Sequence, residues 1–144
     1  MAKEFHLRIV TPDRTVVDRK VVAVSFMGMD GSYGILADHA PMMTATQPGV
    51  VRITESDGSR RDLVTTDGFA EVRDNVLTLV CEAGERAEEI DVERAREAER
   101  RARERIEQIR KGQPGDLPRA EAALRRAMLR QLVGRRAGTR ERVR

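Results

Sequence analysis

Residues 85–101 read ERAEEIDVERAREAERR, and the pattern of the sequence changes at this stretch. Before it, short apolar runs are separated by turn residues, which is typical of β-strands. After it, apolar residues recur at three- and four-residue spacing, which is typical of amphipathic helices. The stretch therefore separates a predicted β domain, residues 1–86, from a predicted helical domain, residues 87–144.

The same stretch contains a candidate ligand site. Asp91 is the predicted N-cap of the first helix, because a carboxylate there can accept a hydrogen bond from an unpaired backbone N–H. Arg94 lies one turn further on, and Arg101 lies two turns beyond Arg94 on the same helix face. A capping carboxylate beside two aligned guanidinium groups is a candidate pocket for an anion or a nucleotide.

Eight to ten short strands are expected between Phe5 and Glu82. Phe5, Leu7 and Ile9 alternate with polar residues, which predicts a strand with one buried face. Asp57-Gly58, between two strand-like runs, is the strongest hairpin signal in the chain. Short strands joined by tight turns pack most economically as two sheets, so we predict a β-sandwich of about ten short antiparallel strands.

Two amphipathic helices are predicted to follow, joined by the turn sequence KGQPGD at 111–116. The apolar stripe of the first helix comprises Val92, Ala95, Ala98, Ala102, Ile106 and Ile109. The stripe of the second comprises Ala120, Leu124, Ala127, Met128 and Leu132. A short loop between two such helices predicts an antiparallel α-helical hairpin. Residues 134–144 are basic and carry no helix-end signal, so we expect a frayed tail.

The alanine-rich stripes affect the expected energetics of the hairpin. A buried leucine side chain contributes roughly 1.5–3 kcal/mol, whereas alanine contributes about one methyl group. We therefore expect the hairpin to be held only weakly to the β domain. Docked and undocked states could then lie within a few kcal/mol of each other.

Charge is distributed unevenly over the 144 residues. Residues 1–84 carry a net charge of −3 and residues 85–144 a net charge of +6. Of the 27 basic residues, all but Lys3, Lys20 and Lys111 are arginines. Arginine favours bidentate contacts to carboxylate or phosphate, although the base composition of a genome could produce the same bias.

Several functional classes are disfavoured by the sequence. The basic half suggests nucleic-acid binding, but its arginines alternate with glutamates and the chain has no Trp and few aromatic residues on which bases could stack. Pairs such as Glu97 and Arg101 also fit a simple solvated helix face. No phosphate-binding P-loop and no nucleophile elbow occur, and His6 and His39 lack partners at metal-ligand spacing. Independent catalysis and a metal site are therefore not expected.

Compartment signals are few. Cys81 is the only cysteine, so no disulfide within the chain is expected, and its apolar surroundings predict a buried thiol. No leader segment and no apolar run of about 20 residues is present. We expect a soluble protein that is at most peripheral to a membrane.

Several segments resemble the epsilon subunit of bacterial F-type ATP synthase, along nearly the whole chain. Ile9-Val10-Thr11-Pro12 matches that family's first strand and turn. Gly34-Ile35-Leu36 with His39 and Pro41 is similar to its GILPGHxP segment, and residues 68–72, GFAEV, to its GGFxEV strand. Ala37 stands where proline is usual, and Asp67 where the first glycine is usual.

The resemblance implies a two-part, non-catalytic rotor subunit. The β-sandwich would bind the gamma stalk subunit and the ring of membrane c subunits. The helical hairpin would either lie folded or extend into the alpha/beta catalytic head and inhibit ATP hydrolysis. Several bacterial members of the family bind ATP in the folded form through an [IL]DxxRA motif, and residues 90–95 here read IDVERA. Carried over by position, the ATP-binding residues would be Glu85, Ile90, Asp91, Arg94, Ala95, Arg101, Arg126 and Arg130.

We therefore expect a rotor subunit that couples proton flow to ATP synthesis, at the cytoplasmic face of the bacterial plasma membrane. ATP would be a regulatory ligand, with no tightly bound cofactor and no nucleic-acid partner. Alternatives are a free-standing ATP sensor and a nucleic-acid-binding module. Co-purification with the stalk subunit would separate the first alternative from the rotor assignment, and salt-dependent binding to generic DNA would favour the second.

Overall fold

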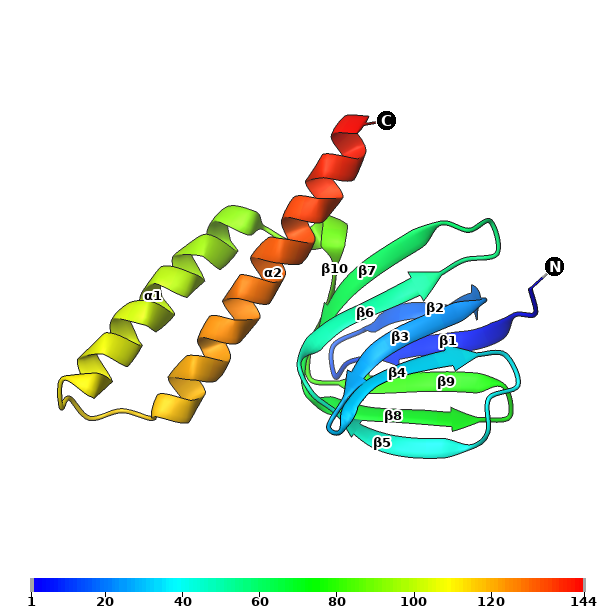
Figure 1. Ribbon diagram of the computed structural model, residues 1–144, viewed down its shortest axis with the longest axis horizontal. Coiled ribbons are helices and arrows are strands. Elements are labelled where there is room, and N and C mark those ends of the chain that lie inside the picture. The colour runs from blue at the N-terminus through cyan, green and yellow to red at the C-terminus, as the bar shows by residue number, and fades with distance from the viewer. Residues whose placement is uncertain (1, 144) are drawn as a thin grey trace. The chain divides into compact units, whose positions relative to one another are not determined.

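At Arg86 the chain passes from strands to helices. A computed structural model describes residues 2–143, and side chains as far as residue 138. The chain divides into two units, Met1–Arg86 and Ala87–Arg144. The first is built of β-strands and the second of helices (Figure 1). The predicted combination of a β-sandwich and a helical hairpin is confirmed.

The first unit contains ten described strands, at the upper end of the expected number. They are β1 (Phe5–Val10), β2 (Thr15–Val21), β3 (Ala23–Gly28), β4 (Gly31–Leu36), β5 (Met42–Thr46), β6 (Gly49–Thr54), β7 (Arg60–Thr65), β8 (Gly68–Arg73), β9 (Val76–Cys81) and β10 (Gly84–Arg86). Val21 ends β2, and β3 begins two residues later, at Ala23. The strand β10 extends the β pattern into the stretch at 85–101, where Glu85 pairs with Val64.

The strands hydrogen-bond in the order β10-β7-β6-β3-β5-β8-β9-β1-β2, with β4 paired to β3. The sheet bends back on itself into two layers around one core (Figure 1). Four pairs of consecutive strands, β1–β2, β3–β4, β6–β7 and β8–β9, are antiparallel, as expected, but β1 runs parallel to β9. Because β1 and β9 stand at opposite ends of the unit's sequence, no tight turn fixes their relative direction.

Buried and more exposed side chains alternate along several strands, among them β1, β3 and β9, and the buried ones form much of the core. In β1, Phe5, Leu7 and Ile9 are at most 3% exposed, as the sequence predicts. Cys81 is buried in the same core, and burial raises the pKa of its thiol. Gly68 marks a close approach between β8 and β9, because a side-chain carbon there would overlap the carbonyl oxygen of Val80. This explains the glycine at the start of the segment GFAEV.

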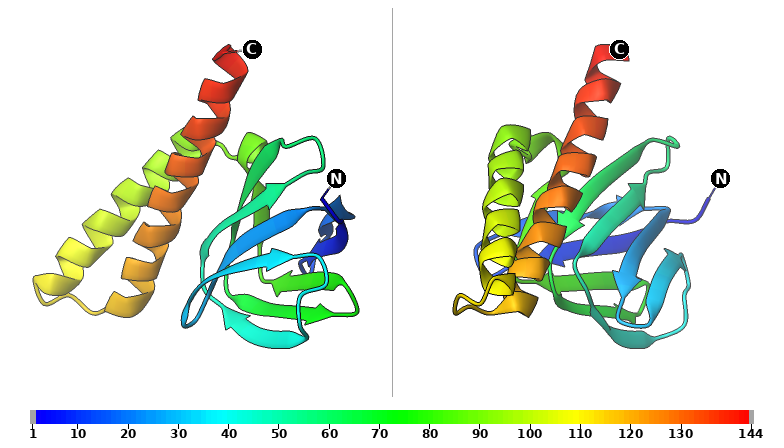
Figure 2. Two further views of the ribbon diagram at one scale, coloured as in Figure 1. Left: turned by 45° about the vertical axis from the view of Figure 1, so that its right-hand side comes forward. Right: turned by 60° about the vertical axis from the view of Figure 1, so that its left-hand side comes forward.

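The second unit is an antiparallel helical hairpin (Figure 2). A 3₁₀ turn, η1 (Ala87–Glu89), precedes α1 (Val92–Arg110) and α2 (Leu117–Val143). The connection between the helices contains Gly112 at φ 97°, a conformation that favours glycine. Buried alanines line the contact between α1 and α2, namely Ala95, Ala102, Ala120 and Ala127.

Two predicted members of the second stripe are misplaced. Met128 and Leu132 are each 47% exposed, whereas Gln131 and Val133 are buried. Gln131 lies one turn after Ala127, on the side of α2 that meets α1. Successive residues turn by about 100° around a helix, so Met128 and Leu132 lie to the side of this stripe. The prediction followed hydrophobicity and passed over a polar residue at the correct spacing.

The predicted frayed tail is also wrong, since α2 continues to Val143. Gly134, the first residue of that predicted tail, is a buried position within the helix. A side-chain carbon on Gly134 would lie 2.8 Å from Val92 Cγ2 and 3.0 Å from Ile90 Cγ2. The glycine therefore allows the start of the hairpin to approach α2 closely. Arg144 lies outside the described residues.

Candidate functional site

Asp91 begins α1 as the sequence predicts. Its backbone is extended, at φ −81° and ψ 100°, and its carboxylate accepts a hydrogen bond of 3.1 Å from the backbone N–H of Arg94. Such a cap contributes about 1 kcal/mol to helix stability. The bond also holds the Asp91 carboxylate at the N-terminal end of α1, next to the turn that carries Arg94.

Two other residues of the predicted motif are buried in the hairpin. Ala95 is fully buried and Ile90 is 8% exposed. Ile90 lies beside Gly134 of α2, so it anchors the start of the hairpin. Ile90 and Ala95 therefore pack inside the hairpin. Asp91 and Arg94 are the residues of the motif whose polar side chains can contact a ligand.

Arginines with identical spacing lie on both helices. Positions i, i+7 and i+11 share one helix face. On α1 this pattern comprises Arg94, Arg101 and Arg105, and on α2 it comprises Arg119, Arg126 and Arg130. We call these six residues the arginine face. It contains all four arginines predicted to bind ATP, together with two that the sequence reasoning did not select.

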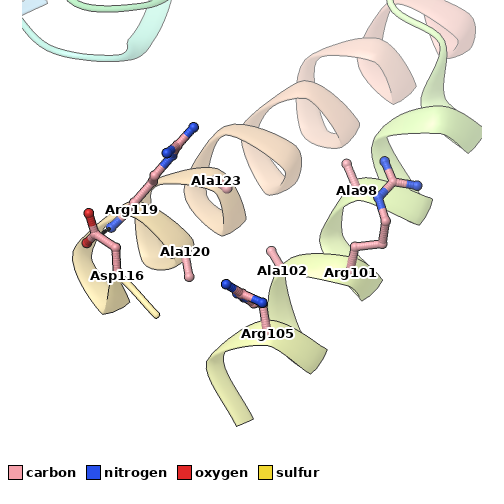
Figure 3. Close-up of a pocket in the computed structure, with 8 residues that line it drawn as sticks. All are labelled: Ala98, Arg101, Ala102, Arg105, Asp116, Arg119, Ala120 and Ala123. Carbon is pink, nitrogen blue, oxygen red and sulfur yellow. Dashed lines mark hydrogen bonds between the residues drawn. The ribbon is translucent and has the colours of Figure 1, made fainter. Parts of the chain in front are cut away.

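A cavity shows that the two sets lie on the same side of the hairpin. Its volume is about 540 Å³, and Arg101 and Arg105 of α1 line it together with Arg119 and Ala123 of α2 (Figure 3). Arg126 and Arg130 follow Arg119 and Ala123 at seven-residue spacing, so they continue the same stripe. The arginine face is therefore one surface built from both helices.

Acidic partners lie mostly elsewhere on the hairpin. Arg96, Arg100 and Arg103 pair with Glu93, Glu104 and Glu99 respectively, at 2.9–3.0 Å. On the arginine face, Arg101 Nη1 lies 3.8 Å from Glu97 Oε2. A surface with more guanidinium groups than nearby carboxylates can bind phosphate oxygens by charge-assisted hydrogen bonds.

Glu85 belongs to the strand unit, where it lies in β10. The other seven predicted ATP-binding residues belong to the helical unit. The membership of Glu85 in the same site remains a prediction.

The strand unit carries a second candidate surface, which the sequence reasoning did not identify. Phe69 of β8 pairs with Val80 of β9 and with Ala45 of β5, and Met43 lies two residues from Ala45 on the same strand face. Met43 is 69% exposed and Phe69 59% exposed. We call Met43, Ala45, Phe69 and Val80 the apolar patch. Contiguous exposed apolar residues of this kind mark protein-protein contacts.

Within the part of the chain that the structure describes, no three His, Cys, Asp or Glu residues are grouped so that they could hold a metal ion. None of the described helices has the length and apolar character that a membrane span requires.

Comparison with known families decides the assignment. Residues 4–87 match the family model described as the ATP synthase delta/epsilon chain, β-sandwich domain. Residues 88–130 match the model of its long α-helix domain. The chain belongs to this ATP synthase delta/epsilon family. It is thus an epsilon-type, non-catalytic subunit of F-type ATP synthase, as the resemblance implied.

Bacterial epsilon chains are similar over most of their length. The ATP synthase epsilon chain of Nitratidesulfovibrio vulgaris (strain DP4) is 41% identical over 133 residues, covering 92% of this chain and 97% of that relative. The epsilon chain of Symbiobacterium thermophilum is 48% identical over 128 residues, covering 88% and 90%.

Solved structures share the fold of this epsilon-family chain. A chain of the Euglena gracilis mitochondrial ATP synthase, in an OSCP/F1/c-ring structure, superposes with a TM-score of 0.73 at 24% identity, covering 90% of this chain and 79% of that chain. A chain of the Tetrahymena thermophila central stalk/c-ring structure superposes with a TM-score of 0.58 at 16% identity, covering 92% and 98%. At these identities the likeness concerns the fold.

Proposed function

We propose that this epsilon-family chain is a rotor subunit that joins the gamma stalk subunit to the ring of membrane c subunits. The apolar patch on β5, β8 and β9 supports an anchoring role for the strand unit. The structural neighbours come from assemblies described as a central stalk with a c-ring and as F1 with a c-ring. The chain would work as a peripheral subunit at the cytoplasmic face of the bacterial plasma membrane.

We further propose that the folded hairpin binds ATP as a regulatory ligand. The observation that carries this proposal is the arginine face, where Arg94 and Arg101 of one helix share a surface with Arg126 and Arg130 of the other. Four guanidinium groups suit a triphosphate. Glu85 and Asp91 would accept hydrogen bonds from the adenine, the ribose or a neighbouring arginine, while Ile90 and Ala95 hold the motif in place.

ATP binding would set the state of the hairpin. A ligand that binds only the folded form stabilises it by about 2.7 kcal/mol at a hundredfold excess over Kd. At low ATP the hairpin would open, extend towards the alpha/beta catalytic head and inhibit hydrolysis. Its many arginines could there contact acidic side chains of the head.

Removal of the hairpin tests the inhibitory part of this function. A chain that ends at Glu89 retains all ten strands. It should assemble with the gamma subunit and the c-ring, and the complex should hydrolyse ATP faster than the complex with the full chain. Unchanged hydrolysis in a fully assembled complex would contradict inhibition by the hairpin.

A further inference from the structure

A second cavity of the helical unit lies on another side of α2. Its volume is about 600 Å³, and its lining includes Met128, Leu129 and Leu132 together with Arg125 and Arg135. None of its lining residues belongs to the arginine face. Met128 and Leu132 are each 47% exposed, so the rest of the described chain leaves almost half of each residue uncovered. An exposed apolar groove on a helix is a candidate contact surface for a second helix.

Charged residues stand at equal intervals on both sides of Met128. Glu121 lies seven residues before it and Arg135 seven residues after it, and this spacing places all three on one helix face. Leu124 lies four residues before Met128, and Leu132 lies four residues after it. From one end to the other, the face therefore carries an acid, three apolar side chains and a base. We call these five residues the Met128 stripe.

The Met128 stripe is complementary to itself when two copies of α2 run antiparallel. With Met128 opposite Met128, each Glu121 is level with Arg135 of the second copy, and each Leu124 is level with Leu132. A parallel arrangement would instead place Glu121 beside Glu121 and Arg135 beside Arg135, where like charges repel. Charges beside an apolar seam set the relative direction of paired helices. The charges of this stripe therefore favour an antiparallel pair.

The polar side chains around the stripe are compatible with this pairing. Glu121 Oε1 lies 3.9 Å from Arg110 Nη2, so its ion pair within the hairpin is long and weak. Arg135 donates a hydrogen bond of 3.2 Å to Gln131 Oε1, which is one residue type without charge. Arg125 lies three residues before the centre of the stripe, so it falls level with the uncharged Gln131 of the second copy. The antiparallel pair thus brings opposite charges together and sets no like charges opposite one another.

We propose that the Met128 stripe is a self-association surface, through which two free chains form an antiparallel dimer. One helix from each copy makes a small interface, so the dissociation constant should be on the order of tens of micromolar. Met128 is about 200° from Arg126 around α2, at 100° per residue. The stripe and the arginine face therefore lie on different sides of the helix, and the proposal depends neither on ATP binding nor on the rotor role.

Sedimentation equilibrium of the full chain, over about 5–500 µM, tests this surface. The wild-type chain should pass from monomer to dimer as the concentration rises. Met128→Glu places two carboxylates at the centre of the pair and should weaken association about tenfold or more. Met29→Glu is the matched control, because it makes the same change at a methionine of the strand unit that is 64% exposed, and it should change the dissociation constant less than about twofold. Far-UV circular dichroism checks that each variant retains its fold.

Exchange of the two charges gives a sharper test. Glu121→Arg and Arg135→Glu each set like charges opposite one another, so each should weaken association about fivefold or more. The double variant restores opposite charges across the interface and should associate within about threefold of the wild type. Glu121 and Arg135 are about 21 Å apart along one helix, at 1.5 Å per residue, so contacts within one copy cannot produce this rescue.

Three results would overturn the proposal. The first is a wild-type chain that stays monomeric over the whole concentration range. The second is an equal loss of association in Met128→Glu and Met29→Glu, which would place the contact elsewhere. The third is a double variant that associates no better than Glu121→Arg alone, which would show that Glu121 and Arg135 do not meet across two copies. Failure of ATP to bind would leave the proposal unaffected.

Discussion

Gln131 Nε2 donates a hydrogen bond of 2.7 Å to Glu99 Oε2, and this contact ties α2 to α1. Gln131 is only 7% exposed, and its Oε1 accepts a hydrogen bond of 3.2 Å from Arg135. Glu99 accepts a further bond of 3.0 Å from Arg103. The hairpin, whose helices otherwise meet largely through alanines, therefore contains a polar tie between them.

Loss of this tie should weaken the hairpin. We expect Gln131→Ala to lower the free energy of unfolding by about 1.5–3 kcal/mol, because a hydrogen bond to a charged group is lost. Gln113→Ala in the exposed loop is the control and should have little effect. Thermal unfolding followed by helical circular dichroism measures both. Equal melting temperatures for the two variants would show that the tie adds no stability.

The tie should also make the hairpin sensitive to acid. The hydrogen bond from Gln131, followed by that from Arg103, lowers the pKa of Glu99 below its ordinary value of 4.5. A lowered carboxyl pKa adds stability above pH 4.5, and this contribution is lost as the pH falls through the folded-state pKa. The free energy of unfolding should therefore fall less for Glu99→Gln than for the wild type when the pH is lowered from about 7 to about 3.5. The same pH dependence in both chains would refute this role.

The two helix caps offer a matched comparison. Asp91 and Asp116 each accept a 3.1 Å hydrogen bond from the backbone N–H three residues on. Asp91→Ala and Asp116→Ala should each destabilise the hairpin by about 1 kcal/mol. Only Asp91→Ala should weaken ATP binding, because Asp91 belongs to the motif. Equal effects on ATP affinity would mean that Asp91 acts through helix stability alone.

Gly68 should be intolerant of a side chain. Gly68→Ala would place a carbon 2.8 Å from Cys81 Cα and onto the carbonyl oxygen of Val80, so β8 and β9 must separate. We expect a loss of about 3 kcal/mol or more in denaturant unfolding, as for other overpacked sites. Gly34→Ala is the control, because nothing lies within 4 Å of the added carbon. A Gly68→Ala chain as stable as the control would show that the strands adapt freely.

Much of the fold could be predicted because local patterns agree with the final structure. Alternation in β1, the turn at Asp57-Gly58 and the change of period near Glu85 are properties of neighbouring residues. The cap at Asp91 was predictable for the same reason. The parallel pairing of β1 with β9 was not, since it depends on strands far apart in the sequence.

The helical unit shows where local patterns fail. Gln131 is buried because Glu99 of the other helix satisfies its amide, and no pattern within α2 reveals that partner. Gly134 lies within α2 and close to Ile90, a tertiary contact that the sequence around Gly134 does not reveal. The strand β10 has only three residues and no apolar alternation, so it carries no signal of its own.

The candidate site was predictable in part. The resemblance to the epsilon family, carried over by position, identified four members of the arginine face. Arg105 and Arg119 were missed because their sequence surroundings resemble those of the paired arginines on the outer faces. A search for the repeated spacing i, i+7 and i+11 on both helices could have found them.

Titration of the full chain with ATP by calorimetry tests the central claim most directly. The account predicts saturable binding by the wild-type chain, lost in Arg126→Ala and in Arg130→Ala and retained in Arg100→Ala, whose arginine pairs with Glu104. Saturable binding that survives both of the first two substitutions, or no binding up to millimolar ATP, would contradict an ATP site on the arginine face.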